Sequence, residues 1–165
     1  MDIYNINYSL LANTLEIILD PLTLLINKCF ERGTFPKCLK LSRVIPLHKK
    51  GDKNNVDNYR PISIVPLFGK LIERILKDRL TSFFEKNNVF CESQFGFRTG
   101  SSTTKAVLKV LESVVGGLER GEHSVLSLCD LSKAFDCVPH GLLLDKLYRY
   151  GIRGTPLRLI RSYLS

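Results

Sequence analysis

The chain has 165 residues, of which 44% are hydrophobic and 24% charged. This composition excludes a mostly disordered chain and predicts one globular domain with its own core. The 24 Lys and Arg outnumber the 16 Asp and Glu, which gives a net charge of +8 and favours a polyanionic partner: nucleic acid, a nucleotide or anionic lipid. Many basic domains bind no polyanion, however, so charge alone does not decide.

Membrane insertion and secretion are not expected from this sequence. No apolar run reaches the roughly 18 residues of a membrane span, because polar residues interrupt the nearest run, between Leu10 and Phe30. The N-terminus has no basic segment of the kind that begins a signal peptide. The five cysteines and three histidines are scattered, without a C-x-x-C pattern. We therefore expect a reduced, intracellular chain with neither a disulfide framework nor a zinc site.

Two helices are predicted near the N-terminus, after a polar segment (residues 1–8) that we expect to be poorly ordered. Apolar residues recur at helical spacing over residues 10–19. Asp20 and Pro21 then form an N-cap and first-turn pair, which predicts that a second helix begins there. Gly33 is expected to end that second helix.

A β-hairpin with a basic tip is predicted next. Residues 41–47 form a short β-prone run, residues 49–52 have the composition of a turn, and residues 57–63 return as a second extended segment. Residues 68–84 then carry the clearest helical pattern in the chain, with apolar side chains at intervals of three and four.

A glycine-bearing loop at residues 94–100 precedes another predicted helix. Ser101 or Ser102 is expected to cap that helix. Its apolar residues recur at helical spacing, which predicts a stripe buried against the core. The stripe consists of Val107, Val110, Leu111, Val114, Val115 and Leu118.

The last part of the chain is predicted to contain a buried strand and two more helices. The strand covers residues 124–129 and ends at Asp130, and the helices cover residues 140–150 and 156–164. A single strand among helices leaves sheet edges that need partners. The order of helices, hairpin, helices, strand and helices predicts the α+β class.

Asp130 is the main candidate for a metal ligand. Carboxylates hold Mg²⁺ together with phosphate oxygens and water, and an acid at the end of a buried strand is held rigidly enough for that role. Taken alone, however, such an Asp is more often a turn or N-cap residue. Phe135 follows in the same segment, where its ring would lie under a nucleotide sugar or would simply fill the core.

Two groups of residues are candidates for contacts with nucleotides. Lys49 and Arg60 flank the predicted hairpin, where cations bind a triphosphate or are merely solvated. Gln94, Phe97 and Arg98 lie in the glycine-bearing loop and suit stacking on bases and contacts to phosphates; the alternative is a loop anchored by its aromatic residues. No Walker-type glycine loop and no G-x-S-x-G motif occurs, so nucleophilic hydrolase chemistry is not indicated.

Six sequence blocks occur in an order that resembles the reverse transcriptases of non-LTR (LINE-type) retrotransposons. The resemblance covers nearly the whole chain from about Pro21 onward. Its most specific blocks are Asn58-Tyr-Arg-Pro-Ile-Ser63 and the segment from Asp130 to Val138. The other four blocks are Gly33–Pro36, Val44–Asp52, Lys70–Arg74 and Gln94–Arg98.

The resemblance implies a right-hand polymerase that uses Mg²⁺, an RNA template, a DNA primer and dNTPs. It implies no membrane association and a location in the cytoplasm and nucleus. Residues 1–20 would form a partly helical N-terminal segment, residues 21–120 a fingers-like region, and residues 121–165 the start of the palm, all within one domain.

The resemblance also implies roles for individual residues. Asp130 resembles the motif-A aspartate that binds both metal ions, and Phe135 resembles the aromatic residue that checks the 2′ position of the incoming sugar. Arg60, and less directly Lys49, resembles the fingers cation that contacts the triphosphate. The remaining implied contacts are those of the backbone amides of Leu131, Ser132, Lys133 and Ala134 with the triphosphate, and those of Arg98 and Gln94 with the template or nucleotide.

The sequence departs from the family pattern because the later motifs are missing. Neither the Pro-Gln-Gly motif nor the aromatic-x-Asp-Asp motif occurs in these 165 residues. We therefore expect a fragment that has no polymerase activity by itself. The alternatives are a fragment that only binds nucleic acid, a non-functional truncated product with exposed apolar faces, and a host protein that reuses the fold.

Overall fold

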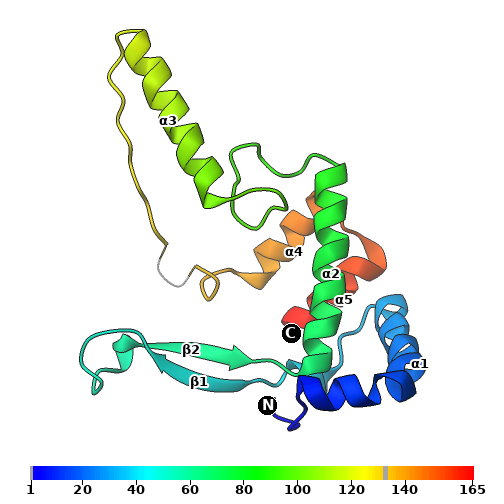
Figure 1. The fold of residues 1–165 in the computed structure, drawn as a ribbon. Helices are drawn as coiled ribbons and strands as arrows, with labels where there is room; N and C mark the ends of the chain where they lie inside the picture. The colour runs from blue at the N-terminus through cyan, green and yellow to red at the C-terminus, as the bar shows by residue number, and fades with distance from the viewer. Residues whose placement is uncertain (1, 132–133) are drawn as a thin grey trace. The chain divides into compact units, whose positions relative to one another are not determined.

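A computed structural model describes residues 2–131 and 134–165, in which helices predominate (Figure 1). Two compact units divide the chain. The first consists of Met1–Lys77 and Pro139–Ser165, and the second of Asp78–Val138. The elements are α1 (Tyr8–Arg32), β1 (Arg43–His48), β2 (Tyr59–Ile64), α2 (Leu67–Lys86), α3 (Thr103–Glu119), α4 (His140–Arg149) and α5 (Gly154–Leu164), with short 3₁₀ helices at Lys37–Lys40 and Val56–Asn58.

Helix α1 is one continuous helix, so the predicted boundary at Asp20 and Pro21 was wrong. The side chain of Asn7 caps its start by accepting a hydrogen bond from the Leu10 N–H, and Gly33 ends it with a left-handed backbone (φ 64°). Pro21 lies inside the helix. A proline has no N–H to donate to the carbonyl in the preceding turn, and the missing hydrogen bond commonly bends a helix. The helix changes direction partway along its length (Figure 1).

Helix α1 also has the length and composition of a membrane-spanning helix. The sequence did not suggest this, because polar residues interrupt the apolar run. Core helices of soluble proteins and N-terminal signal sequences share these properties. Most of α1 is not buried, but Ile26 and Cys29 in its second half belong to the core of the first unit.

The predicted hairpin is confirmed as an antiparallel pair of strands that lie side by side (Figure 1). Arg43 is opposite Ile64, and the register continues to His48 opposite Tyr59. The Lys49 N–H donates to the carbonyl of Asn58 at 2.8 Å and extends the ladder by one bond. Gly51 has a φ of +87°, and a Cβ there would lie 2.8 Å from the Asn58 side chain, so the turn requires glycine.

The core of the first unit is made of side chains from α1, α2 and α5 and of Phe35, which follows α1. Phe35, Ile72 and Leu159 are each only 1% exposed, and Ile26 and Cys29 complete the cluster. Phe35 also packs edge-on against Tyr163, with ring centroids 4.9 Å apart. The apolar periodicity predicted a helix around Ile72, but it predicted neither the part of Phe35 nor which helices meet in this core.

In the second unit, α3 begins where predicted, because the side chain of Ser102 accepts a hydrogen bond from the Lys105 N–H at 3.2 Å. The predicted burial of its apolar stripe was wrong, however. Val107, Leu111 and Leu118 are 58%, 52% and 61% exposed. The apolar periodicity predicts which side chains lie on one side of the helix, but it does not predict that another element packs against that side.

The predicted strand at residues 124–129 is also absent from the described structure. Residues 122–131 have no regular secondary structure, and Val125 and Leu128 are 92% and 87% exposed. A strand forms only when a neighbour accepts and donates its backbone hydrogen bonds. The two strands that the structure describes pair with each other, so the α+β prediction holds only for a helix-rich fold with one two-stranded sheet.

Candidate nucleotide and metal site

Asp130 lies at the end of the exposed extended segment rather than at the end of a buried strand, and its side chain is exposed. Among the described residues, no three His, Cys, Asp or Glu side chains gather closely enough to hold a metal ion. Mg²⁺ needs near-octahedral oxygen coordination. These residues therefore offer one carboxylate at Asp130 and do not by themselves form a metal site.

Phe135 lies in a turn at residues 134–137, and its side chain is 82% exposed. The alternative that Phe135 fills the core is therefore wrong. Its ring meets that of Phe97 edge-to-face, with centroids 6.2 Å apart and planes at 85°. Leu131 and Ala134, whose backbone amides were predicted to approach a triphosphate, are exposed. The same prediction for Ser132 and Lys133 lies outside the described residues.

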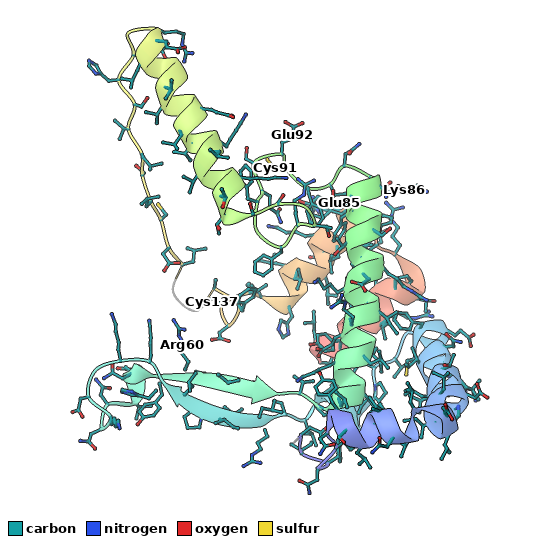
Figure 2. The ribbon with its side chains drawn as sticks, in the orientation of Figure 1. Arg60, Glu85, Lys86, Cys91, Glu92 and Cys137 are labelled. Atoms are coloured by element: carbon teal, nitrogen blue, oxygen red, sulfur yellow. The ribbon has the colours of Figure 1, made fainter. Side chains whose placement is uncertain are left out.

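The predicted triphosphate-binding cations belong to the hairpin of the first unit. Arg60 is on β2 opposite Leu47, and its side chain extends from the strand into solvent (Figure 2). Directly opposed residues of an antiparallel pair share one face of the sheet, so Arg60 and Leu47 lie on the same face. Lys49 follows β1 directly and is also exposed. Asp130 and Phe135 belong to the second unit.

Arg98 anchors the loop that follows α2 instead of pointing freely to solvent. Its Nε and Nη2 donate to the two carboxylate oxygens of Glu85, at 3.1 and 2.8 Å. Its Nη1 donates to the Cys91 carbonyl at 3.0 Å, and its guanidinium lies 5.4 Å from the centre of the Phe90 ring. The hydrogen bond to Glu85 raises the pKa of Arg98 further above its usual range. Glu85 and Cys91 mark this region in Figure 2.

Gln94 also makes a contact within the loop, because its Nε2 donates to the Gly96 carbonyl at 3.1 Å. The two residues predicted to contact nucleic acid therefore hold the loop in shape. The alternative in which Phe97 anchors the loop is wrong, since Phe97 is 85% exposed. The sequence did not predict Glu85 as the partner of Arg98. The one feature that pointed to Glu85 was its position as an acidic residue near the end of the predicted helix at residues 68–84.

The chain was compared with models of known protein families. Residues 47–165 match the model of the family described as reverse transcriptase (RNA-dependent DNA polymerase).

This chain belongs to the reverse transcriptase family. A reverse transcriptase domain has a right-hand polymerase fold and, in general, uses a divalent metal ion. The matched range includes β2 and the segment that carries Asp130.

Curated reverse transcriptases of mobile elements are similar to most of this chain. The RNA-directed DNA polymerase from mobile element jockey of Drosophila melanogaster is 35% identical over 129 residues, which cover 78% of this chain and 14% of the relative. The probable RNA-directed DNA polymerase from transposon BS, of the same species, is 31% identical over 150 residues, covering 87% and 16%. The probable RNA-directed DNA polymerase from transposon X-element, also of Drosophila melanogaster, is 31% identical over 144 residues, which cover 87% of this chain and 16% of the relative.

The predicted resemblance to reverse transcriptases of non-LTR retrotransposons is therefore confirmed. The chain spans only 14% to 16% of the length of these relatives.

Proposed function

We propose that this chain forms the fingers and the first part of the palm of an RNA-directed DNA polymerase from a non-LTR retrotransposon. Residues 21–120 would be the fingers-like region, residues 121–165 the start of the palm, and residues 1–20 an N-terminal segment. The observation that carries this proposal is the family match over residues 47–165, within which the block from Asp130 to Val138 occurs in the expected order.

Each predicted site residue has a role in this proposal. Asp130 would supply one carboxylate for Mg²⁺, and Phe135 would lie beside the sugar of the incoming nucleotide. Arg60 and Lys49 would contact the triphosphate, together with the backbone amides of residues 131–134. The exposure of the side chains of Asp130, Phe135, Arg60 and Lys49 supports these roles, because each is accessible to a ligand.

Arg98 and Gln94 would help to bind the template mainly by shaping their loop. The three guanidinium nitrogens of Arg98 already donate to Glu85 and Cys91. A direct contact with the template would have to use the remaining N–H groups of Arg98. We therefore expect an Arg98 substitution to disturb the loop first and the nucleic-acid contact second.

The chain alone would bind nucleic acid without catalysing nucleotide transfer. Two metal ions that stabilise the attacking and leaving oxygens need several ligands around them, and the described residues gather no such set. The sequence also contains no Asp-Asp pair. RNA template, DNA primer and dNTPs would be the partners of the longer polymerase, in the cytoplasm and nucleus.

Filter binding of a single-stranded RNA across a salt series tests the binding part of this proposal. Binding through phosphates makes the logarithm of the affinity fall linearly with the logarithm of the salt concentration, by about 0.7 per neutralised phosphate. We expect Lys49→Ala/Arg60→Ala to weaken binding and to flatten that slope. The matched control is Lys28→Ala/Arg32→Ala on α1, which removes the same charge and should change binding less. Equal effects of both double variants would count against a hairpin site.

A non-functional product is the second candidate, and the exposed apolar surface favours it. The stripe of α3 and the side chains of Val125 and Leu128 are open to solvent, and large exposed apolar patches promote aggregation. Light scattering and chemical unfolding separate the candidates. A monodisperse chain that unfolds cooperatively and binds RNA supports the polymerase fragment, whereas aggregation without RNA binding supports the non-functional product.

A further inference from the structure

The second half of α1 borders an apolar groove with a volume of about 500 Å³. Five of the residues that line the groove recur at intervals of three and four along the helix, so they lie on one side of it. They are Pro21, Leu24, Leu25, Lys28 and Arg32. At 1.5 Å per residue, this stretch of the helix is about 17 Å long. Leu24 and Leu25 are 57% and 48% exposed, so the groove is open to an occupant.

The other wall of the groove is the segment that follows α1, and this segment is held in place. Thr34 and Pro36 line the groove. The Thr34 N–H donates to the Cys29 carbonyl at 3.1 Å. Between them, the Phe35 N–H donates to Ser162 Oγ at 3.0 Å, and the Phe35 side chain is only 1% exposed. The groove is therefore formed before an occupant arrives, which lowers the cost of binding.

The two ends of the groove differ in charge. Pro21, Leu24 and Leu25 line the end that lies nearer the middle of α1, and Lys28 and Arg32 line the end at its C-terminus. Both cations are exposed, and neither forms an ion pair with another residue that the structure describes. The described lining residues include no acid. The groove therefore suits an elongated occupant with an apolar side and negative charge at one end.

We infer that this groove binds an amphipathic helix of a partner protein, which runs antiparallel to α1 and carries acidic side chains in its first turn. Apolar side chains along one side of the partner helix pack on Leu24 and Leu25, as amphipathic helices do in hydrophobic grooves. Its acidic first turn lies beside Lys28 and Arg32. Acids are favourable in a first turn, because the N-terminal end of a helix is the positive end of its dipole. This inference goes beyond the proposed function, which assigns no partner to the groove.

A synthetic peptide tests the inference with the whole chain. The probe has about 15 residues, enough for four helical turns, with leucines at intervals of three and four and with two glutamates in its first turn. A fluorophore on the peptide reports binding through its anisotropy. We expect saturable binding of this acidic peptide. A control peptide of the same composition, with its leucines distributed around the helix, should not bind.

Charge variants test the contact at the cationic end. Lys28→Ala/Arg32→Ala should weaken binding of the acidic peptide about 2- to 30-fold, the range expected for two exposed ion pairs. Lys28→Glu/Arg32→Glu should weaken it further through like-charge repulsion, and should bind a peptide with two lysines in place of the glutamates. Such an exchange of preference shows that the variant is folded. Lys50→Glu/Lys53→Glu is the matched control, because it changes the net charge equally at exposed positions outside the groove.

An apolar variant provides a second, independent measurement. Leu24→Ser should weaken binding at least about 5-fold, the loss typical of an anchor residue in an interface. Leu19→Ser is the matched control, because Leu19 is also on α1 and 51% exposed but does not line the groove. Circular dichroism confirms that both variants are folded. Equal effects of the two variants would overturn the placement of the partner helix.

Two further measurements identify other occupants of the groove. If light scattering shows a dimer that Leu24→Ser converts to a monomer, a second copy of the chain occupies the groove. If the chain binds phosphatidylcholine vesicles and Leu24→Ser abolishes this binding, the groove faces a membrane. Either result overturns the inference, as does the absence of saturable binding of the acidic peptide. None of these results depends on RNA binding, which tests the proposed function separately.

Discussion

Asp2 accepts a hydrogen bond from the backbone N–H of Leu67, the first residue of α2, through Oδ2 at 2.9 Å. Its other carboxylate oxygen accepts the N–H groups of Tyr4 and Ile6, at 2.9 and 3.0 Å. Asp2 is 5% exposed. We expected the polar segment at residues 1–8 to be poorly ordered. For the described residues from Asp2 onward that expectation was wrong, because Asp2 holds them to a helix 65 residues away.

Removing the Asp2 carboxylate should destabilise the first unit. Asp2→Ala leaves the N–H groups at the start of α2 and in the N-terminal turn without their acceptor, and loss of a cap costs about 1–2 kcal/mol. Urea unfolding at neutral pH measures this change. Asp20→Ala is the control, because Asp20 is exposed on α1 and should shift the free energy of unfolding far less. Equal effects of the two variants would contradict the capping role.

The stabilisation by Asp2 should also depend on pH. Burial alone raises the pKa of Asp2, but the N–H groups of Leu67, Ile6 and Tyr4 outweigh it, and the pKa lies below its ordinary value of 3.8. A lowered pKa means that the stabilisation is present above pH 3.8 and is lost as the pH falls through the lower value of the folded state. We therefore expect the difference in unfolding free energy between the wild type and Asp2→Asn to shrink as the pH falls below 3.8. A difference that stays constant would show that the charge has no part in it.

Gly33 should not tolerate a side chain. Its φ is +64°, and a Cβ there would lie 2.8 Å from the Thr155 carbonyl oxygen and 3.1 Å from the Cβ of Arg158 on α5. Gly33→Ala should lower the free energy of unfolding by at least about 1–2 kcal/mol from the left-handed backbone alone, and the overlap with Thr155 should add to this. Thermal unfolding measures the change.

Gly141→Ala is the matched control for that prediction. Gly141 is helical, in α4, and its Cβ would meet no atom within 4 Å. Because alanine favours a helix over glycine, the free energy of unfolding should stay the same or rise by up to about 1 kcal/mol. If Gly33→Ala is tolerated as well as Gly141→Ala, the described contact between the end of α1 and α5 is wrong.

Tyr163 should ionise at a higher pH than an ordinary tyrosine. Its burial and the hydrogen bond that its hydroxyl donates to Glu73 raise its pKa from the ordinary value of 10.0 to about 12. The stabilisation associated with this raised pKa is complete below pH 10 and is lost as the pH rises through 12. Ultraviolet absorbance of phenolate should show a late step that is missing in Tyr163→Phe. A wild type without this late step would contradict the hydrogen bond to Glu73.

Tyr163→Phe should at the same time have a small effect on stability at neutral pH. The phenylalanine ring keeps the packing against Phe35 and loses one hydrogen bond at a partly exposed site. Such a bond contributes about 0.5–1 kcal/mol, which urea unfolding can detect. A loss several times larger would mean that the substitution disturbs the core rather than this bond.

Local features of the fold could be predicted from the sequence because short patterns determine them. Ser102 caps α3 and Gly33 ends α1 as expected, and β1 and β2 form the predicted hairpin. Each depends on residues within a few positions of one another. Pro21 shows the limit of such patterns, since a proline after an acid is compatible with both the start and the interior of a helix.

Contacts between distant residues could not be predicted in this way. The pair of Arg98 and Glu85 joins residues 13 positions apart, and that of Asp2 and Leu67 joins residues 65 apart. Neither partner carries a local signal that identifies the other. The apolar residues of 124–129 likewise favour burial, but the sequence does not show which segment would cover them. The family resemblance identified the block that begins at Asp130, but the roles of its residues stay predictions.

Primer extension on an RNA template with Mg²⁺ and dNTPs tests the central claim most directly. We predict that the 165-residue chain binds RNA with strong salt dependence but extends no primer, because in the proposed function Asp130 supplies only one carboxylate and the described residues gather no further group of metal ligands around it. The contradicting result is template-dependent incorporation by this chain that disappears in Asp130→Ala.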